Sequence, residues 1–338
     1  MLHKSKSLFT KKRPMIIAEI GNNHEGSFNT AIKLIDEASK CGVDAVKFQT
    51  FRVEDFINKE EKKRYNQLKK FQLSYNQFKN LKKIANNYNL KFMSTPLDYE
   101  SSNFLLKNSE LIKIASSDNN FFPMIQNIIK RNKPLIISTG MLNFDEISYL
   151  VKKISNKIGK KKLKEKVALL HCVTSYPVDN ENANLNSINY LKKKFDLCIG
   201  YSDHTLGNEA CLYAVSNGAK IIEKHFTIDK RFSKFRDHAM SADFEELREI
   251  VKSIRKIEKM KGSYQKKIGK CEVPFLKAIR RMPFAKKNIK KGDKISFSNT
   301  RFLRSTKSKS FLDLENIIGK KIRNDVKKNQ IIKNQNLK

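Results

Sequence analysis

The chain has 338 residues, more than one typical domain, so we expect one large domain followed by a small one. Hydrophobic residues make up 39% and charged residues 30%, a mixture typical of globular proteins rather than disordered or membrane proteins. The net charge of +35 makes nucleic acid a partner to consider. The lysines are scattered along the chain and are not interleaved with aromatic residues on one element, which argues against nucleic-acid binding as the main role.

The five cysteines are widely spaced and form no Cys-x-x-Cys pair, so neither a disulfide framework nor a structural zinc site is expected. Residues 1–14 form a basic arm, and the short apolar run after it reaches the charged Glu19 too soon for a signal peptide. No apolar run approaches the roughly 20 residues that a membrane helix needs. These features predict a cytoplasmic protein.

Short apolar runs alternate with longer amphipathic segments along the first 262 residues, and no internal repeat is visible. Each run of the first kind reads as a strand and each of the second kind as a helix. The predicted strands are 15–19, 45–49, 91–94, 111–114, 135–138, 167–172, 197–200 and 220–224. The predicted helices are 28–40, 75–87, 101–106, 124–129, 145–158, 187–194, 208–217 and 244–261.

Apolar strands separated by helices indicate a parallel sheet that is covered on its outside, and eight units in about 250 residues favour a closed (β/α)8 TIM barrel. An open doubly wound sheet is the alternative, but no Gly-x-Gly-x-x-Gly turn follows any predicted strand. The alternation stops after Gly262. We therefore predict a barrel over residues 15–262, a linker over 263–280 and a small, mainly β domain over 281–338.

Charged and imidazole side chains stand at the ends of the predicted strands, where catalytic groups of a barrel project. Glu19 and Lys113 end otherwise apolar strands, where burial is costly unless the charge is paired or meets a ligand. Lys47 alone would be an ordinary snorkelling lysine, and a lone histidine would more often be structural. His204 and His225, however, follow adjacent strands beside Glu19, which predicts a two-histidine site for Mn²⁺ or another divalent ion, completed by water and substrate.

A second group combines hydroxyls with one fixed cation: Lys113, Thr95, Ser116 and Ser138 come from the third to fifth strands. A single Ser or Thr after a strand is usually a turn or helix-capping residue. Several of them beside an ammonium group have the composition of a phosphate site.

Seven short motifs in one order resemble the sialic acid (N-acylneuraminate) synthase family. They are the segments 17–26, 46–50, 92–96, 136–141, 170–177, 200–205 and 223–226. The resemblance runs from about residue 15 to the end, and the segment 290–295 is similar to the antifreeze-like (SAF) domain that these enzymes carry.

The resemblance implies condensation of phosphoenolpyruvate with an N-acylated mannosamine-type sugar, giving a nine-carbon 2-keto sugar acid and phosphate, with N-acetylneuraminate synthase as the first choice. Legionaminate and pseudaminate synthases are alternatives, and a basic nucleic-acid- or polysaccharide-binding protein on a retired barrel is a remote one. The family also implies a homodimer in which the C-terminal domain caps the partner's barrel. Thr174, Ala115 and Ser305 depart from residues found in other members.

Residue roles follow from the same resemblance. His204 and His225 would bind Mn²⁺, with Mg²⁺ or Co²⁺ as alternatives, and Glu19 and Lys47 would steer charge and protons near the reacting carbons. The residues expected to hold phosphoenolpyruvate are Thr95, Lys113, Ser116, Ser138, Thr174 and Ser202. Those expected to face the sugar are Gln49, Tyr176, Asp237 and, from the cap, Arg304.

Overall fold

The computed structural model describes residues 9, 13–306 and 315–338. The chain divides into two compact units, Met1–Gly262 and Ser263–Lys338. Among the described residues, no helix is both long and apolar enough to cross a membrane.

The first unit is a closed barrel of eight parallel strands in which each strand pairs with the next in the chain and the eighth pairs with the first. This arrangement confirms the predicted TIM barrel. The strands are β1 (Met15–Gly21), β2 (Ala45–Thr50), β3 (Lys91–Pro96), β4 (Leu111–Ile114), β5 (Leu135–Ser138), β6 (Val167–Cys172), β7 (Cys198–Asp203) and β8 (Ile221–His225).

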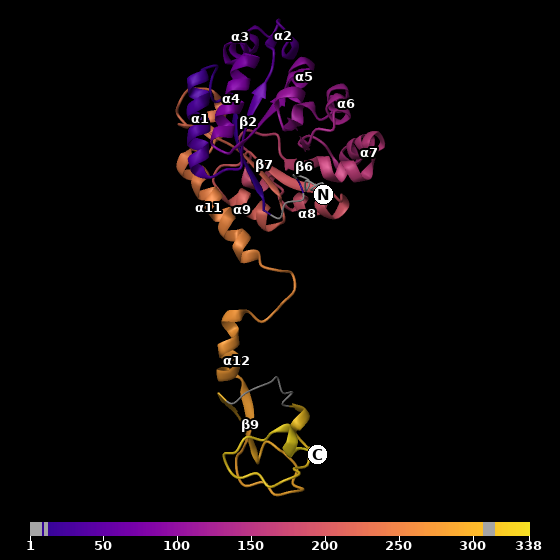
Figure 1. Cartoon of the computed structure of the whole chain (residues 1–338), viewed down its shortest axis with the longest axis vertical. Helices are drawn as coiled ribbons and strands as arrows, with labels where there is room; N and C mark the ends of the chain where they lie inside the picture. Colours follow the sequence, from indigo (N-terminus) through magenta and orange to yellow (C-terminus); the bar gives the residue numbers. More distant parts are fainter. Residues whose placement is uncertain (1–8, 10–12, 307–314) are drawn as a thin grey trace, which may run out of the picture. The chain divides into compact units, whose positions relative to one another are not determined.

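Helices surround the barrel, and α1, α4 and α11 lie side by side on one flank (Figure 1). Several begin at a residue whose side chain accepts a hydrogen bond from the first turn, such as Ser74 of α4, Asn143 of α7 and Asp243 of α11. The helices of this unit are α1 (Phe28–Cys41), α2 (Val53–Phe56), α3 (Lys62–Phe71), α4 (Tyr75–Asn87), α5 (Tyr99–Asn108), α6 (Phe122–Lys130), α7 (Phe144–Lys166), α8 (Asn186–Lys194), α9 (Glu209–Ser216), α10 (Arg236–Met240) and α11 (Phe244–Lys261).

Side chains alternate along each strand between the barrel interior and the layer under the helices. On β1, Ile16 and Ala18 pack in the large cluster under the helices, whereas Ile17 packs in a smaller cluster inside the barrel. The same alternation directs Glu19, two residues beyond Ile17, toward the interior at the carboxyl end of β1.

Some predicted boundaries were wrong at polar ends. β7 continues three residues past the predicted end at residue 200, because Tyr201 and Ser202 still pair with β6 and β8. The helices α2 and α3, which lie between β2 and α4, were not predicted. Their sequence is rich in lysine, but α3 buries Tyr65, Leu68 and Phe71. The predicted helix end at residue 158 coincides with a break in α7, where Gly159 takes a φ of 81°.

The second unit contains the helix α12 (Val273–Ile279), which lies inside the predicted linker of residues 263–280. Two antiparallel strands follow, β9 (Arg281–Ala285) and β10 (Thr300–Arg304). Isolated bridges such as Ile289 with Val326 join the remaining segments. Its core is a cluster of small and aliphatic side chains: Ala285, Ile289, Ile295, Ile317, Ile322, Val326 and Ile332.

Candidate active site

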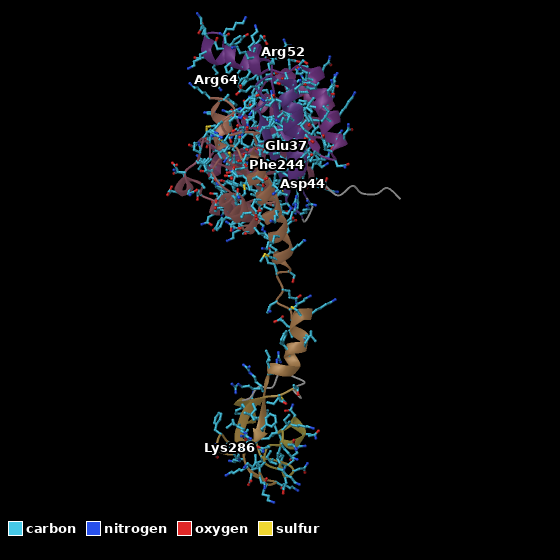
Figure 2. The ribbon with its side chains drawn as sticks, turned by 90° about the vertical axis from the view of Figure 1, so that its left-hand side faces the viewer. Glu37, Asp44, Arg52, Arg64, Phe244 and Lys286 are labelled. Carbon is cyan, nitrogen blue, oxygen red and sulfur yellow. The ribbon has the colours of Figure 1, made fainter. Side chains whose placement is uncertain are left out.

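A cavity of about 1090 Å³ opens at the carboxyl end of the barrel strands. Arg64, one of its lining residues, lies at the end of this unit opposite Asp44, which precedes β2 (Figure 2). Eleven residues singled out from the sequence line it: Glu19, Gln49, Lys113, Ser116, Ser138, Thr174, Tyr176, Ser202, His204, His225 and Asp237. The structure thus gathers residues from seven strands and the loops after them at one site.

Four buried charges of alternating sign form a row at the cavity floor and directly beneath it. Lys47 Nζ lies 2.6 Å from Glu19 Oε2 and 3.9 Å from Glu223 Oε2. Lys113 Nζ lies 3.5 Å from Glu223 Oε1, which also accepts a hydrogen bond of 2.9 Å from Ser202 Oγ. The row is neutral as a whole, which offsets part of the desolvation that each buried charge suffers.

The pKa values of the two carboxyl groups in this row, Glu19 and Glu223, shift in opposite directions. Burial raises the pKa of Glu19 from its ordinary 4.5 to about 7, although Lys47 opposes the shift. Burial would also raise the pKa of Glu223, but Lys113 and Lys47 outweigh it and hold that pKa below its ordinary value. Burial lowers the pKa of Lys113. Glu223 is therefore a fixed anion, whereas Glu19 can gain or lose a proton near neutral pH.

The two predicted imidazoles face each other with ring centroids 5.4 Å apart. His204 Nδ1 lies 2.9 Å from the carbonyl oxygen of Val173, so Nδ1 carries the proton and donates it, which leaves the lone pair on Nε2. His225 Nδ1 is buried without a hydrogen-bond partner among the described residues. Burial, together with the positive charge around it, lowers the pKa of His225 far below its usual range, so its ring is neutral and able to bind a metal.

A tight group of hydroxyls adjoins Lys113. Ser138 Oγ is buried and has no hydrogen-bond partner in the described part of the chain. A Cβ atom on Gly140 would lie 2.4 Å from Thr174 Oγ1 and 2.6 Å from Ser116 Oγ, closer than atoms can approach. Glycine at position 140 is therefore what lets these hydroxyls converge, and the resulting cradle suits an anion's oxygens.

Polar and aromatic groups also line the cavity. The ring centroids of Tyr176 and His204 lie 4.3 Å apart. The guanidinium carbon of Arg236 lies 4.8 Å from the centroid of the Tyr176 ring. Gln49 Oε1 accepts a 2.8 Å hydrogen bond from Asn22 Nδ2. Asp237 Oδ1 is buried and lies 3.4 Å from Arg236 Nε. An aromatic face with amide and carboxylate groups is a common surface for recognising a sugar's hydroxyls.

Three predicted site residues do not line the cavity. Lys47 contacts Glu19, which lines the cavity, and donates a 3.2 Å hydrogen bond to Thr95 Oγ1. Lys47 and Thr95 therefore lie behind the residues that line the cavity. Arg304 lies exposed on β10 of the second unit, and its predicted role toward the sugar stays a prediction.

Glu223 was given no role in the site from the sequence, although this residue lies within the motif 223–226. The period of two along β8 was the available signal, since Glu223 and His225 share one face of the strand. Cys172 was likewise given no role, and its Sγ lies 3.9 Å from His204 Nδ1. Lys63 and Arg64 of α3 also line the cavity, on a helix that was not predicted.

Comparison with known proteins decides the family. Residues 34–266 match the NeuB family, and residues 280–338 match the SAF domain. The chain belongs to the sialic acid synthase (NeuB) family. The resemblance in the sequence motifs and the C-terminal antifreeze-like domain are thereby confirmed, and the protein is an enzyme of the nonulosonic acid synthase type.

Relatives of this NeuB-family chain act on different sugars. It is 38% identical to the N,N'-diacetyllegionaminic acid synthase of Campylobacter jejuni, over 95% of this chain and 99% of that protein. It is 32% identical to the N-acetylneuraminate-9-phosphate synthase of Mus musculus, over 91% of this chain and 88% of that protein. A crystal structure of the N-acetylneuraminic acid synthetase of Leptospira borgpetersenii superposes with a TM-score of 0.72 at 36% identity, covering 77% of this chain and 89% of that one.

Proposed function

We propose that this enzyme condenses phosphoenolpyruvate with the open-chain aldehyde of an N-acylated mannosamine-type sugar, giving a nine-carbon 2-keto sugar acid and phosphate. The observation that carries the proposal is the pair of facing imidazoles, with centroids 5.4 Å apart, in the same cavity as Lys113 and a hydroxyl cradle. One end of that cavity suits a polarised carbonyl and the other suits an anionic enol ester.

A divalent metal, Mn²⁺ first and Mg²⁺ or Co²⁺ as alternatives, fits His204 and His225. A first-row metal lies about 2.1 Å from each imidazole nitrogen, so two rings that share one ion have centroids within about 6.5 Å. No third His, Cys, Asp or Glu joins them among the described residues, which leaves coordination positions for water and substrate oxygens. When bound, the metal supplies a Lewis acid that polarises the sugar aldehyde.

Lys113 and the cradle would hold phosphoenolpyruvate. Its phosphate and carboxylate need positive charge and hydrogen-bond donors, which Lys113 and the hydroxyls of Ser116, Ser138 and Thr174 provide. Glu223 pairs with Lys113 from below and accepts the Ser202 hydroxyl, so it orients both groups. This placement directs C3 of the enol ester toward the imidazole side of the cavity.

Glu19 would manage the proton of the attacking water. C3 of phosphoenolpyruvate forms a bond to the aldehyde carbon, and water adds to the cationic C2. The proton that this water releases balances the one taken up by the aldehyde oxygen. Phosphate then leaves with cleavage of the bond between C2 and its oxygen. With a pKa near 7, the Glu19 carboxylate can accept the proton of that water, and Lys47 stabilises the carboxylate before this transfer.

The acceptor would lie against Tyr176, Gln49 and Asp237. N-acetylmannosamine, the precursor of N-acetylneuraminate, is the acceptor first expected from the sequence. The 38% identity to an enzyme named for N,N'-diacetyllegionaminic acid favours an acceptor with two N-acetyl groups as the second candidate. The pseudaminate precursor keeps the same chemistry, and a few hydroxyl contacts decide among these sugars.

We also propose a cytoplasmic homodimer in which the C-terminal domain of one subunit caps the barrel of the other and Arg304 faces the N-acyl group. Mixing an Arg304→Ala subunit with a His225→Ala subunit tests this arrangement. A capped dimer regains part of its activity on mixing, whereas independent subunits do not.

Phosphate release tests the proposed reaction. With phosphoenolpyruvate and Mn²⁺, we expect release only when N-acetylmannosamine, its 6-phosphate or a diacetamido sugar is added, and the fastest acceptor identifies the product. No release with any acceptor, combined with a salt-sensitive gel shift of nucleic acid, would instead support the binding protein on a retired barrel.

A further inference from the structure

A second buried ion pair lies on the outer face of the barrel, directly behind the two histidines. Lys224 Nζ is 2.7 Å from Asp203 Oδ2, and the side chains are 2% and 0% exposed. The two residues are register partners on β8 and β7, and each immediately precedes one of the histidines. Neither lines the active-site cavity, and Asp203 Oδ2 accepts a 3.2 Å hydrogen bond from Cys211 Sγ of α9.

The pair holds the backbone of Thr205, the residue that follows His204. Asp203 Oδ1 accepts hydrogen bonds from Thr205 N at 2.9 Å and Thr205 Oγ1 at 2.8 Å. Lys224 Nζ donates to the carbonyl oxygen of Thr205 at 2.5 Å. Tyr201 O–H donates to Asp203 Oδ1 at 3.0 Å. Thr205 is thus held through its N–H, hydroxyl and carbonyl groups, which restrains the turn that carries the His204 ring.

Most of the layer under the helices, in which this pair lies, is apolar. On the same two strands, Ile199 of β7 and Ile222 of β8 belong to the apolar cluster under the helices, as does Ala214 of α9. A well-packed hydrophobic pair at such a place is often as stabilising as an ion pair, because burying two charges costs desolvation. Unlike an apolar pair, the charged pair makes hydrogen bonds, and these hold the Thr205 segment in a defined orientation.

We propose that Asp203 and Lys224 are positioning residues that fix the separation of His204 and His225 for a shared divalent metal. On the inner face, the hydrogen bond from Ser202 to Glu223 joins the same two strands one residue earlier. β7 and β8 are thus joined on both faces just before their imidazoles. The inference rests on the proposed metal chemistry and extends it to residues that touch neither metal nor substrate.

The test compares two double variants with the wild type. Asp203→Leu with Lys224→Met removes both charges together, which avoids leaving one buried and unpaired. Asp44→Leu with Arg255→Met is the matched control, because it removes a 2.6 Å ion pair at the other end of the barrel. Mn²⁺ binding is measured by the electron paramagnetic resonance signal of free Mn²⁺, and the His204 ring is followed by its ¹⁵N shifts in ¹⁵N-histidine-labelled protein.

We expect the Asp203/Lys224 double variant to stay folded and to bind Mn²⁺ about 10- to 100-fold more weakly, the usual effect of losing a supporting shell. Its His204 ¹⁵N shifts should move from those of a fixed Nδ1–H form toward the average of two tautomers, while the control keeps wild-type values in both measurements. Wild-type Mn²⁺ affinity and wild-type shifts in the first variant would overturn the proposal. If the wild type itself bound no Mn²⁺, the proposed metal chemistry would fail, and the ¹⁵N shifts alone would decide the positioning role.

Discussion

The two ends of the barrel interior use the same strands for opposite purposes. At the amino end the interior is filled by Ile17, Ala45, Met93, Leu111, Ile136 and Ile221. Two residues further along the same strands stand Glu19, Lys47, Thr95, Lys113, Ser138 and Glu223, all buried. Because the strand period is two, each pair shares one face of its strand. The comparison shows that the apolar layer that stabilises the barrel and the polar layer that forms the site are adjacent, two residues apart along each strand.

The largest expected effect comes from removing a metal ligand in the polar layer. His225→Ala should lower turnover by at least about 1000-fold, because Lewis-acid stabilisation contributes several kcal/mol and each 1.4 kcal/mol is a factor of ten. The rate of phosphate release is the measurement, and chelation of the wild type should have the same effect. His171→Ala is the control, since His171 lies outside the cavity and bonds to the carbonyl oxygen of Ala183. Full activity in His225→Ala would remove the metal assignment.

The protonation of Glu19 gives the next effect. Its folded-state pKa is raised to about 7, so a general base at this position is protonated and inactive below that pH. We expect kcat/KM to rise about tenfold per pH unit up to about 7 and then to level off. Glu19→Gln should lose about 100-fold or more in rate and should also lose this acid limb. An unchanged acid limb in the variant would assign the proton transfer to another group.

A smaller and more selective effect is expected at the cradle. The Cβ of Gly140→Ala would collide with the hydroxyls of Ser116 and Thr174, so both must shift. Displacements of this size cost up to about 100-fold, and we expect the KM for phosphoenolpyruvate to rise about tenfold or more. The KM for the sugar should stay within about twofold of the wild type, because Tyr176 and Asp237 are untouched. Equal increases in both KM values would contradict a separate phosphoenolpyruvate cradle.

The smallest effect on catalysis is expected in the apolar layer. Ile136→Ala empties a fully buried site two residues before Ser138 and should lower the free energy of unfolding by about 2–5 kcal/mol. Denaturant unfolding measures this loss, and kcat per folded molecule should stay near that of the wild type. A fall in kcat comparable to that of Gly140→Ala would show that the two layers are not separate.

Much of this division could be predicted from the sequence. The alternation of apolar runs and amphipathic segments predicted eight strands and the barrel, because the hydrophobic patterns of strands and of helices can be recognised in a single sequence. Charges at the ends of apolar runs then pointed to Glu19 and Lys113, which lie at the site as expected. His204 and His225 could be paired in advance because the closed barrel makes β7 and β8 neighbours.

The remainder depended on contacts that one sequence does not reveal. Ser202 and Asp203 look like loop residues because their polarity ends the apolar run, although both belong to β7. Glu223 lies inside a strand, and the desolvation cost of burying its charge is offset by Lys47 and Lys113, which come from distant segments. The role of Gly140 depends on two hydroxyls reaching it from β6 and β4 loops, a convergence without a local signal.

Pulsed electron paramagnetic resonance of Mn²⁺-loaded, ¹⁵N-histidine-labelled enzyme tests the central claim most directly. We expect one Mn²⁺ per chain, coupled to two histidine nitrogens, with one coupling lost in His204→Ala and one lost in His225→Ala. A bound Mn²⁺ with no histidine coupling, or with couplings that survive both substitutions, would contradict the account.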